Sequence, residues 1–377
     1  MKKIVVLVVA LMLGAAVAQT VRIGVNLELS GRFATIGTTS LQGIEAALSQ
    51  SGADIELSVC DNATTVEGSV ACANRFVDEG VLAVVGPIST THAIPAAQVL
   101  QAAGVIMIST ASTNPATTQI GDHIFRMAYT DDFQGRVAAR YATNELGASS
   151  AIVFRQQDDD YSFGLAGFFA EEFEALGGET VVVDYVSNTV DFSAQINDVL
   201  GTPADVIYFS GFCAEGATLV PALRAAGFTQ QLLGADASDD SQCPVGGGEA
   251  FDGYVFTGFG GAEVLSGDAA TRAADFATIF RVNTPEASDL NGFTLSGADT
   301  INVMVEAIRV AGSTDPDAVL AALSNLEEFP GVSGDITYAG TDGTPADRTI
   351  AFFQYSVPGA DGAAWSSTPL FGIGTGD

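Results

Sequence analysis

The segment from Val81 to Thr91 reads Val-Leu-Ala-Val-Val-Gly-Pro-Ile-Ser-Thr-Thr and contains a complete structural transition. Five apolar residues in a row are typical of a strand that is buried on both faces, as in a parallel sheet. The Gly-Pro pair indicates a turn, and the hydroxyl cluster after it is typical of a helix N-terminus, where hydroxyls cap backbone N–H groups. The segment therefore predicts a buried strand at 81–86 that leads into a helix at 91–102.

The same alternation recurs along the chain. The first half predicts strands at 21–27, 55–60, 81–86 and 105–109, with helices at 37–49, 66–79 and 91–102. The second half predicts strands at 151–155, 180–185, 206–210, 231–234 and 253–259, helices at 163–176, 192–200, 215–226, 269–280 and 294–311, and a β-like tail from 350. Two such series predict an α/β fold with two doubly wound parallel-sheet lobes, because right-handed crossovers place helices on both faces of a sheet.

A chain of 377 residues exceeds what one hydrophobic core usually accommodates, which also favours two lobes. No linker rich in Pro or Ser separates the two series, so we expect short crossings that form a three-crossing hinge, at 127–132, 256–260 and 338–344. The expected division is lobe 1 at 19–130 plus 260–340, and lobe 2 at 131–259 plus 341–377.

The N-terminus has the features of an export signal. Lys2 and Lys3 precede an apolar run from Ile4 to Leu13, and a stretch of small residues ends at Ala18. The run is too short to cross a bilayer comfortably, so residues 1–18 are expected to be a cleaved signal peptide rather than an anchor. No cysteine lies near the expected cut, so lipid attachment is not expected.

Without Lys2 and Lys3 the chain carries 12 Arg against 45 Asp+Glu, a net charge of −33. Such a surface repels nucleic acid and anionic lipid, and neither is expected as a partner. Four cysteines in an exported chain favour disulfides, and the pairs near in sequence, Cys60–Cys72 and Cys213–Cys243, are preferred among three pairings. A metal site is not expected, because there is no Cys-x-x-Cys and the two histidines stand apart.

Polar loops follow predicted strands in both halves, at 26–31, 86–91, 109–115 and 234–236. In parallel sheets ligands bind beyond the carboxyl ends of the strands. Hydroxyls and free N–H groups at 86–91 and 109–115 suit a carboxylate, and Asp236 suits an ammonium, so the pattern predicts a small zwitterion between the lobes. The alternative interpretation is that the hydroxyls are helix caps and that Asp236 forms a turn.

Catalytic motifs are missing from the sequence. It has no Gly-x-Ser-x-Gly, no His-Glu-x-x-His and no Gly-x-x-x-x-Gly-Lys, and the acidic run at 158–160 lacks the spacing of a calcium loop. We therefore expect a binding protein that is not an enzyme and needs no cofactor.

Several pieces in order resemble the type I periplasmic binding proteins of the leucine/isoleucine/valine-binding group. They include Val84-Val85-Gly86-Pro87, Thr113-Asn114-Pro115, Phe125-Arg126 with Asp131 to Gly135, and Leu233-Gly234-Ala235-Asp236. The resemblance covers nearly all of the chain after residue 18. It implies a periplasmic protein that closes its lobes around a ligand and delivers it to the inner-membrane permease of an ABC importer. We expect a monomer.

The resemblance also implies roles for single residues. Thr90, with Thr91 beside it, matches the hydroxyl residue that holds the ligand's α-carboxylate, and the Ser112 backbone and the Thr113 hydroxyl match the rest of that cradle. Asp236 matches the acidic partner of the α-ammonium, where Glu is commoner.

Three further positions match the walls of the family's cleft. Tyr161 and Phe212 match the second lobe's face of the cleft, with core packing as the alternative, and Ile36 stands where relatives often carry an aromatic residue. A branched-chain-like amino acid is therefore the expected ligand.

Other functions fit the same pattern. The ligand could be an amide, a urea-like compound or a small organic acid, although an organic acid would disfavour Asp236 as a partner. The lobes could instead serve as the sensing subunit of a receptor kinase, or form the scaffold of a secreted hydrolase.

Overall fold

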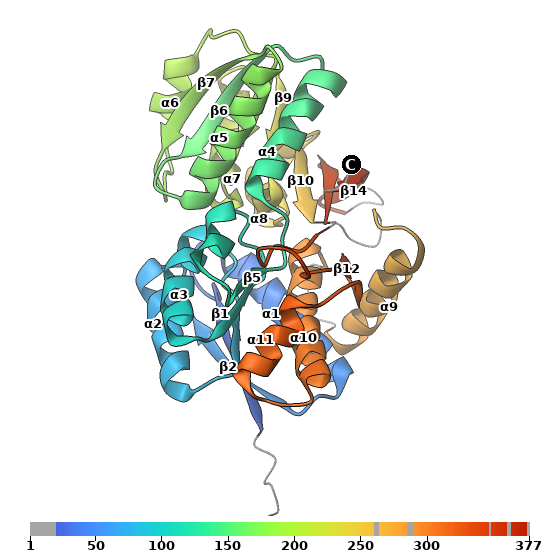
Figure 1. Ribbon diagram of the computed structural model, residues 1–377. Coiled ribbons are helices and arrows are strands. Elements are labelled where there is room, and N and C mark those ends of the chain that lie inside the picture. Colours follow the sequence, from blue (N-terminus) through green and yellow to red (C-terminus); the bar gives the residue numbers. More distant parts are fainter. Residues whose placement is uncertain (1–19, 260–263, 285–289, 347, 360–362, 375–377) are drawn as a thin grey trace, which may run out of the picture.

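The computed structural model describes residues 20–259, 264–284, 290–346, 348–359 and 363–374. The expected signal peptide at 1–18 lies outside these residues. The described chain forms two lobes, one above the other in Figure 1, and each is built around its own main sheet. None of the helices in the described part is both long and apolar enough to pass through a membrane.

The sheet of the first lobe has five parallel strands in the order β2-β1-β3-β4-β5. Its strands are β1 (Val21–Leu27), β2 (Ile55–Asp61), β3 (Ala83–Val85), β4 (Ile106–Ser109) and β5 (Ile124–Arg126). The helices between them are α1 (Ala34–Ser51), α2 (Val66–Glu79) and α3 (Thr90–Ala103), with the 3₁₀ turn η1 (Pro115–Ile120) before β5. The chain returns to this lobe as α9 (Gly267–Asn283), α10 (Gly292–Ala311) and α11 (Pro316–Ser324), followed by a small hairpin of β11 (Phe329–Gly331) and β12 (Gly334–Ile336).

The sheet of the second lobe has seven strands in the order β14-β13-β10-β9-β8-β6-β7. Five are parallel: β6 (Ser150–Gln156), β7 (Glu179–Tyr185), β8 (Val206–Phe209), β9 (Gln231–Gly234) and β10 (Val255–Phe259). Two antiparallel strands extend one edge, β13 (Thr349–Ser356) and β14 (Ser366–Gly374). Its helical segments are α4 (Asp131–Arg140), the π turn η2 (Tyr141–Glu145), α5 (Asp160–Ala175), α6 (Ser193–Val199), α7 (Cys213–Ala225), η3 (Asp236–Ser238), α8 (Gln242–Gly247) and η4 (Gly248–Phe251).

The predicted fold class is confirmed, with additions at the sheet edges. The strands at 21–27 and 231–234 match the prediction to the residue. The β-like tail predicted from residue 350 forms the two antiparallel strands β13 and β14. The strand β5 was not predicted, because three residues give little periodicity.

The third crossing lies at a different place from the one predicted. Residues 338–344 pack on the first lobe, where the Tyr338 hydroxyl donates to the Arg126 carbonyl (2.8 Å) and the Arg126 N–H donates to the Gly343 carbonyl (2.9 Å). The chain therefore passes to β13 after Thr344. The first crossing, between β5 and α4, is where it was predicted. The second predicted crossing ends at residue 260, which lies outside the described residues.

Both preferred disulfides are present and confirm the predicted pairing. Cys60–Cys72 joins β2 to α2, and Cys213–Cys243 joins α7 to α8, with Cα–Cα distances of 5.8 and 4.7 Å. Each bond ties a strand or helix to the neighbouring element of its own lobe.

The largest apolar cluster continues from the first lobe into the second. It contains Ile23 and Val25 of β1 together with Val153 of β6 and Tyr208 of β8. The ring centroids of Phe33 and Phe212, one from each lobe and away from the crossings, lie 4.1 Å apart, so the structure represents the closed arrangement.

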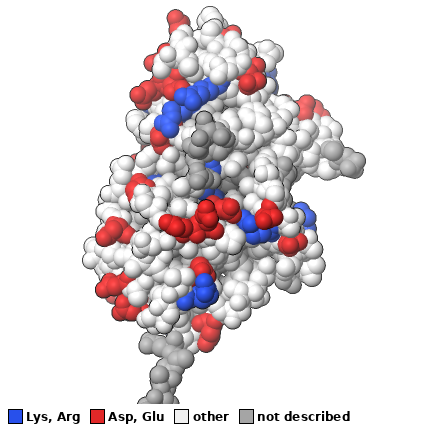
Figure 2. All heavy atoms as spheres, turned by 45° about the vertical axis from the view of Figure 1, so that its right-hand side comes forward, with Lys and Arg blue, Asp and Glu red and all other residues white. Residues whose placement is uncertain are grey.

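Charged side chains are spread over the surface. Figure 2 shows acidic groups in several separate places on both lobes and basic groups mostly beside acidic ones. After Lys3 every basic residue apart from the two histidines is an arginine. Arginine–carboxylate pairs in the described residues are Arg22–Glu56, Arg32–Glu215, Arg75–Glu79, Arg136–Asp132, Arg140–Glu172, Arg155–Asp184, Arg272–Asp335 and Arg309–Glu306.

Helices α1 and α10 pack closely because glycine stands at their crossing. A Cβ on Gly43 would lie 2.0 Å from the Thr294 carbonyl oxygen, and one on Gly297 would lie 2.4 Å from the Ser40 carbonyl oxygen. Backbone atoms cannot yield as a flexible side chain can, so any side chain here separates the two helices.

Gly43→Ala is therefore expected to lower the free energy of unfolding by about 1–3 kcal/mol, measured by urea denaturation. The matched control is Gly167→Ala on the exposed face of α5, where a Cβ meets nothing within 4 Å. This control should raise the free energy of unfolding by up to about 1 kcal/mol, because Ala is the better helix former. Equal effects of the two substitutions would contradict the close helix crossing.

Candidate functional site

A small cavity lies between the lobes, at the carboxyl ends of the parallel strands of both sheets. About 250 Å³ of unfilled space lies within it, part of which is open to solvent. Closure buries its walls, and the side chains of Thr90, Tyr161 and Asp236 are 1, 3 and 4 % exposed. The lining residues are Ile36, Ile88, Ser89, Thr90, Ala111, Thr113, Tyr161, Phe212, Asp236, Ala237 and Phe293.

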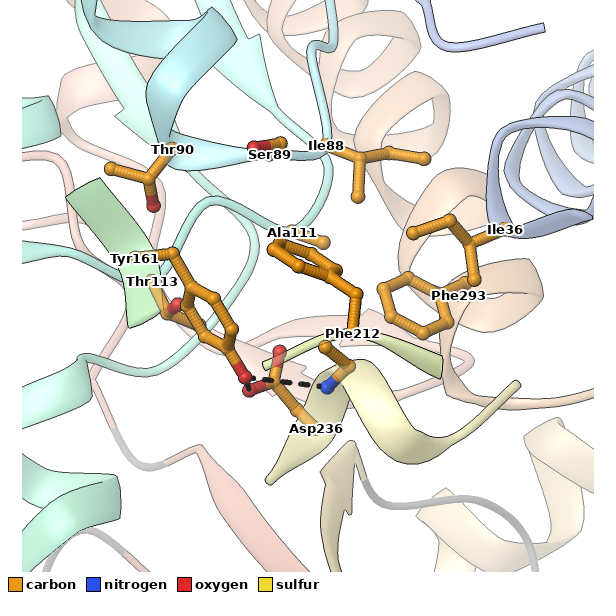
Figure 3. A pocket seen from close by; sticks show the side chains of 11 residues that line it. Ile36, Ile88, Ser89, Thr90, Ala111, Thr113, Tyr161, Phe212, Asp236 and Phe293 are labelled. Atoms are coloured by element: carbon orange, nitrogen blue, oxygen red, sulfur yellow. Dashed lines mark hydrogen bonds between the residues drawn. The ribbon is translucent and has the colours of Figure 1, made fainter. Parts of the chain in front are cut away.

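The turn after β3 carries the first hydroxyls of the site. Gly86 adopts φ 90°, and a Cβ there would lie 2.0 Å from the Asn26 carbonyl oxygen, so only glycine fits beside β1. Ser89 is the N-cap residue of α3, and its buried hydroxyl has no hydrogen-bond partner among the described residues. Thr90, the first residue of α3, turns its hydroxyl toward the cavity in Figure 3. This turn therefore places two hydroxyls at the cavity.

A buried carboxylate supports the turn from behind. Glu28 accepts hydrogen bonds from the backbone N–H groups of Ile88 and Ser89, both at 3.2 Å, and His92 Nδ1 lies 2.8 Å from Glu28 Oε1. The expectation that the backbone N–H groups of 86–91 are free for a ligand is therefore wrong for Ile88 and Ser89, because both donate to Glu28. The support instead fixes where the Ser89 and Thr90 hydroxyls point.

The loop after β4 forms the neighbouring wall. The Ser112 hydroxyl lies 3.1 Å from the Thr90 hydroxyl and 2.7 Å from that of Thr117, and the Ser112 carbonyl accepts from Arg126 Nη1 (3.1 Å). Ser112 is therefore behind the lining, where it positions Thr90. Arg126 is completely buried, and desolvation lowers its pKa to about 10.

Asp236 follows β9 and forms the acidic wall of the second lobe. Its Oδ1 accepts from the Tyr161 hydroxyl (2.7 Å) and from Gln134 Nε2 (2.8 Å), and its own N–H donates to Gln134 Oε1 (3.0 Å). None of these hydrogen bonds comes from a basic side chain. Desolvation is the largest influence on the pKa of Asp236 and raises it to about 6, although the bonds from Tyr161 and Gln134 work in the opposite direction.

A second buried acid, Asp131, lies close to Asp236 at the start of α4. Gln134 Nε2 is 3.4 Å from Asp131 Oδ1, and Asp131 Oδ2 has no hydrogen-bond partner in the described part of the chain. Desolvation, and after it the negative charge of Asp236, raise the pKa of Asp131 well above its usual range. A cation arriving at Asp236 would therefore relieve a region with excess negative charge.

The cavity has a polar end and an apolar end. In Figure 3 the hydroxyls of Thr90 and Thr113 lie on one side, and the side chains of Ile36 and Phe293 lie on the other. The figure also shows the hydrogen bond that the Tyr161 hydroxyl donates to a carboxylate oxygen of Asp236. Such a cavity can hold a compact molecule with a charged head and an apolar tail.

Six of the eight predicted ligand-binding residues line this cavity: Ile36, Thr90, Thr113, Tyr161, Phe212 and Asp236. Ser112 lies behind them. Thr91 points elsewhere, because its hydroxyl donates to Asp159 Oδ2 and accepts from the Asp160 N–H, both at 2.9 Å, across the gap between the lobes.

Ser89 and Ala111 lie in the predicted loops 86–91 and 109–115 but were not singled out as wall residues. Sequence reasoning missed Phe293 as a wall residue and Gln134 as the support of Asp236. Phe293 starts a helix more than 50 residues beyond the last site residue that was predicted, and its only sequence signal is the capping residue Asn291 before it. The described residues contain no group of three or more His, Cys, Asp or Glu side chains that could hold a metal ion.

A cavity enclosed by two α/β lobes, with a polar and an apolar end, defines a solute-binding protein of the closing, two-lobed kind. The chain belongs to the periplasmic binding protein family, whose match covers residues 20–363. The predictions of this family, and of a binding protein instead of an enzyme, are confirmed.

Three similar proteins place the chain within the family. It is 28% identical to the Leu/Ile/Val-binding protein BraC3 of Rhizobium johnstonii, over 89% of this chain and 92% of the relative. The leucine-binding protein LivK of Thermotoga maritima superposes with a TM-score of 0.88 at 29% identity, covering 95% of this chain and 99% of that one. A solute-binding protein of R. palustris, solved with 4-hydroxybenzoate, shares the fold at a TM-score of 0.81 and 21% identity, covering 94% and 97%.

The raised pKa of Asp236 predicts how stability without ligand depends on pH. The folded state holds the proton more tightly than the unfolded state, so stability falls as pH rises from 3.8 to about 6 and is level above that. Asp236→Asn removes this loss while keeping an oxygen acceptor for Tyr161. The difference in free energy of unfolding between Asp236→Asn and the parent should therefore be larger at pH 7.5 than at pH 3.5 by up to about 3 kcal/mol, in favour of the variant. Any effect of the substitution that does not depend on pH adds equally at both pH values.

Urea denaturation at a series of pH values measures this difference. Asp159, whose pKa is also raised, remains in both proteins and cancels in the comparison. The pKa of Asp131 is raised partly by the charge of Asp236, so Asp131 is less destabilising in Asp236→Asn and adds to the difference in the same direction. A difference that stays constant from pH 3.5 to 7.5 would show that Asp236 is not destabilised by burial.

Proposed function

We propose that the protein captures an amino acid with a branched aliphatic side chain by closing its two lobes, and delivers it to an ABC importer. The observation that carries the proposal is Asp236, a buried carboxylate at the cavity between the lobes. In the described residues its side chain accepts hydrogen bonds from a phenol hydroxyl and an amide and from no basic group. The names of the relatives, a Leu/Ile/Val-binding protein and a leucine-binding protein, agree with it.

The two ends of the cavity suit the two parts of such a ligand. The ammonium group would bind Asp236, and the α-carboxylate would accept hydrogen bonds from Thr90, Thr113 and the unpartnered Ser89 hydroxyl. The aliphatic side chain would lie against Ile36 and Phe293, which offer no polar atoms. Charge, hydroxyls and apolar wall thus each have a counterpart in the ligand.

In the closed form the ligand's ammonium group would stabilise the buried carboxylate of Asp236. An ammonium at Asp236 would lower the pKa of that carboxyl again and offset its desolvation. The ligand would make these contacts with both lobes only in the closed arrangement, so it would bind the closed form more tightly than the open form. This difference in affinity shifts the population toward the closed form.

The cellular setting is part of the proposal. Residues 1–18 would direct export to the periplasm and be removed, and the closed protein, as a monomer, would dock on the permease in the inner membrane. We assign 19–130 plus 260–340 to lobe 1 and 131–259 plus 341–377 to lobe 2, with the short segment 341–344 packed on lobe 1.

A small organic acid is the second candidate. Its support is the raised pKa of Asp236, because a protonated carboxyl can donate a hydrogen bond to an acid ligand, and the 4-hydroxybenzoate bound in the R. palustris structure. On this alternative, affinity would rise as pH falls through about 6.

Calorimetry with L-leucine and with 4-methylpentanoate, which is leucine without its amino group, separates the candidates. We expect the parent protein to bind leucine far more tightly than the acid. Asp236→Asn should lose affinity for leucine by about 100-fold or more, as when one partner of a buried charge pair is removed, and change little toward the acid.

Thr90→Val is the companion variant, because it removes a hydroxyl from the proposed carboxylate site. It should weaken leucine binding while keeping the preference for leucine over the acid. Tight binding of 4-methylpentanoate by the parent, or unchanged leucine binding by Asp236→Asn, would contradict the proposal.

A further inference from the structure

One arginine reaches from the first lobe to the second beside the cavity. Arg32 lies in the loop between β1 and α1, and its Nη1 donates to Glu215 Oε1 (2.8 Å) and to Gln156 Oε1 (3.3 Å) of the second lobe. The pair is shielded from solvent, with side-chain exposures of 16% for Arg32 and 2% for Glu215. Salt therefore screens it much less than a surface pair.

This ion pair differs from the other arginine–carboxylate pairs in the described chain because it joins the two lobes. Every other arginine–carboxylate pair recorded there joins two residues of the same lobe, for example Arg22–Glu56 on adjacent strands of the first sheet. Among the arginine–carboxylate pairs named above for the described residues, the Arg32–Glu215 pair alone has to break when the lobes separate. Its free energy therefore enters the balance between open and closed forms directly.

The second lobe holds the acceptors in position before closure. Glu215 stands in the first turn of α7, and its Oε1 also accepts the Asn188 N–H at 2.9 Å. Gln156, the last residue of β6, is oriented by a hydrogen bond from its Nε2 to the Ser187 hydroxyl (2.7 Å). Both contacts lie within the second lobe, so they can persist when the lobes open.

The first lobe holds the donor in a similar way. Asp61 Oδ1 accepts the N–H groups of Leu29 and Ser30, both at 3.1 Å, and the Thr64 hydroxyl donates to the Ser30 carbonyl (2.6 Å). These bonds fix the loop two residues before Arg32. The guanidinium is thus presented from a braced loop, which reduces the entropy lost when the pair forms.

Arg32 also contacts the wall of the cavity. Its guanidinium carbon lies 4.4 Å from the ring centroid of Phe33 and 5.3 Å from that of Phe212, within cation–π range. The two rings are 4.1 Å apart, one from each lobe, and Phe212 lines the cavity. The cation therefore covers the aromatic pair that closes this side of the site.

We propose that Arg32 is a latch: a positioning residue that stabilises the closed lobes through Glu215 and the Phe33–Phe212 pair, and so sets how slowly a bound ligand leaves. The inference rests on the proposed function, because release presupposes a captured ligand.

Other hydrogen bonds between the lobes in the described residues have a neutral group on at least one side. They include those from Gln242 Nε2 to the Thr35 hydroxyl (3.0 Å) and to the Arg32 carbonyl (3.4 Å), and from the Thr91 hydroxyl to Asp159 Oδ2 (2.9 Å). They align the lobes but carry no charge pair.

Stopped-flow measurement of L-leucine dissociation tests the latch. Arg32→Gln should raise the dissociation rate by about tenfold while changing the association rate little. The effect is smaller than for a completely buried charge pair, because the Arg32 side chain is 16% exposed. Arg22→Gln is the matched control, because it removes the same charge from an exposed pair within one lobe, and it should leave the rate unchanged. Glu215→Gln combined with Arg32→Gln should add little to Arg32→Gln alone.

An unchanged dissociation rate in Arg32→Gln, or an equal rise in Arg22→Gln, overturns the latch. If the parent binds none of L-leucine, L-isoleucine and L-valine, the proposed function fails instead, and small-angle X-ray scattering without ligand then decides the latch. Arg32→Gln should show a larger radius of gyration than the parent and Arg22→Gln, and equal radii would refute it. Matching circular dichroism spectra of the three proteins confirm that each is folded.

Discussion

The closed arrangement of this protein encloses a carboxylate that the chain itself does not neutralise. Asp236 receives hydrogen bonds from a phenol and an amide, and its negative charge raises the pKa of a second buried acid, Asp131. In a desolvated site such an arrangement is unfavourable until a positive charge arrives. The rest of the site can be understood as the means of bringing that charge in and holding the molecule that carries it.

Much of the site's geometry is set by residues that do not line the cavity. Glu28 and His92 fix the turn that carries Ser89 and Thr90, and Ser112 and Arg126 fix the loop beside it. Buried polar groups of this kind are satisfied by one another, which leaves few alternative arrangements for the hydroxyls that face the ligand. The binding groups are thus oriented before the ligand enters.

The sequence predicted the fold well because each β-α unit carries its own local signals. Apolar runs such as 81–85 and the polar loops after them depend on near neighbours only, as does Asp236 at a strand end. Thr90 and Thr113 were singled out within their loops by the resemblance to a known family. Whether Thr90 or Thr91 faces the cavity depends on the rotation of α3 about its axis, which one residue changes by about 100°. The Arg32–Glu215 contact joins residues 183 positions apart, and no local pattern indicates it.

The close crossing of α1 and α10 has a consequence for selectivity. Ile36 stands near the start of α1 and Phe293 near the start of α10, and the glycine contacts between these helices leave no room for one to slide against the other. The apolar wall of the first lobe therefore moves as a single rigid body. A bulkier ligand would be accommodated by a wider angle between the lobes, so the degree of closure would decrease as the size of the solute increases.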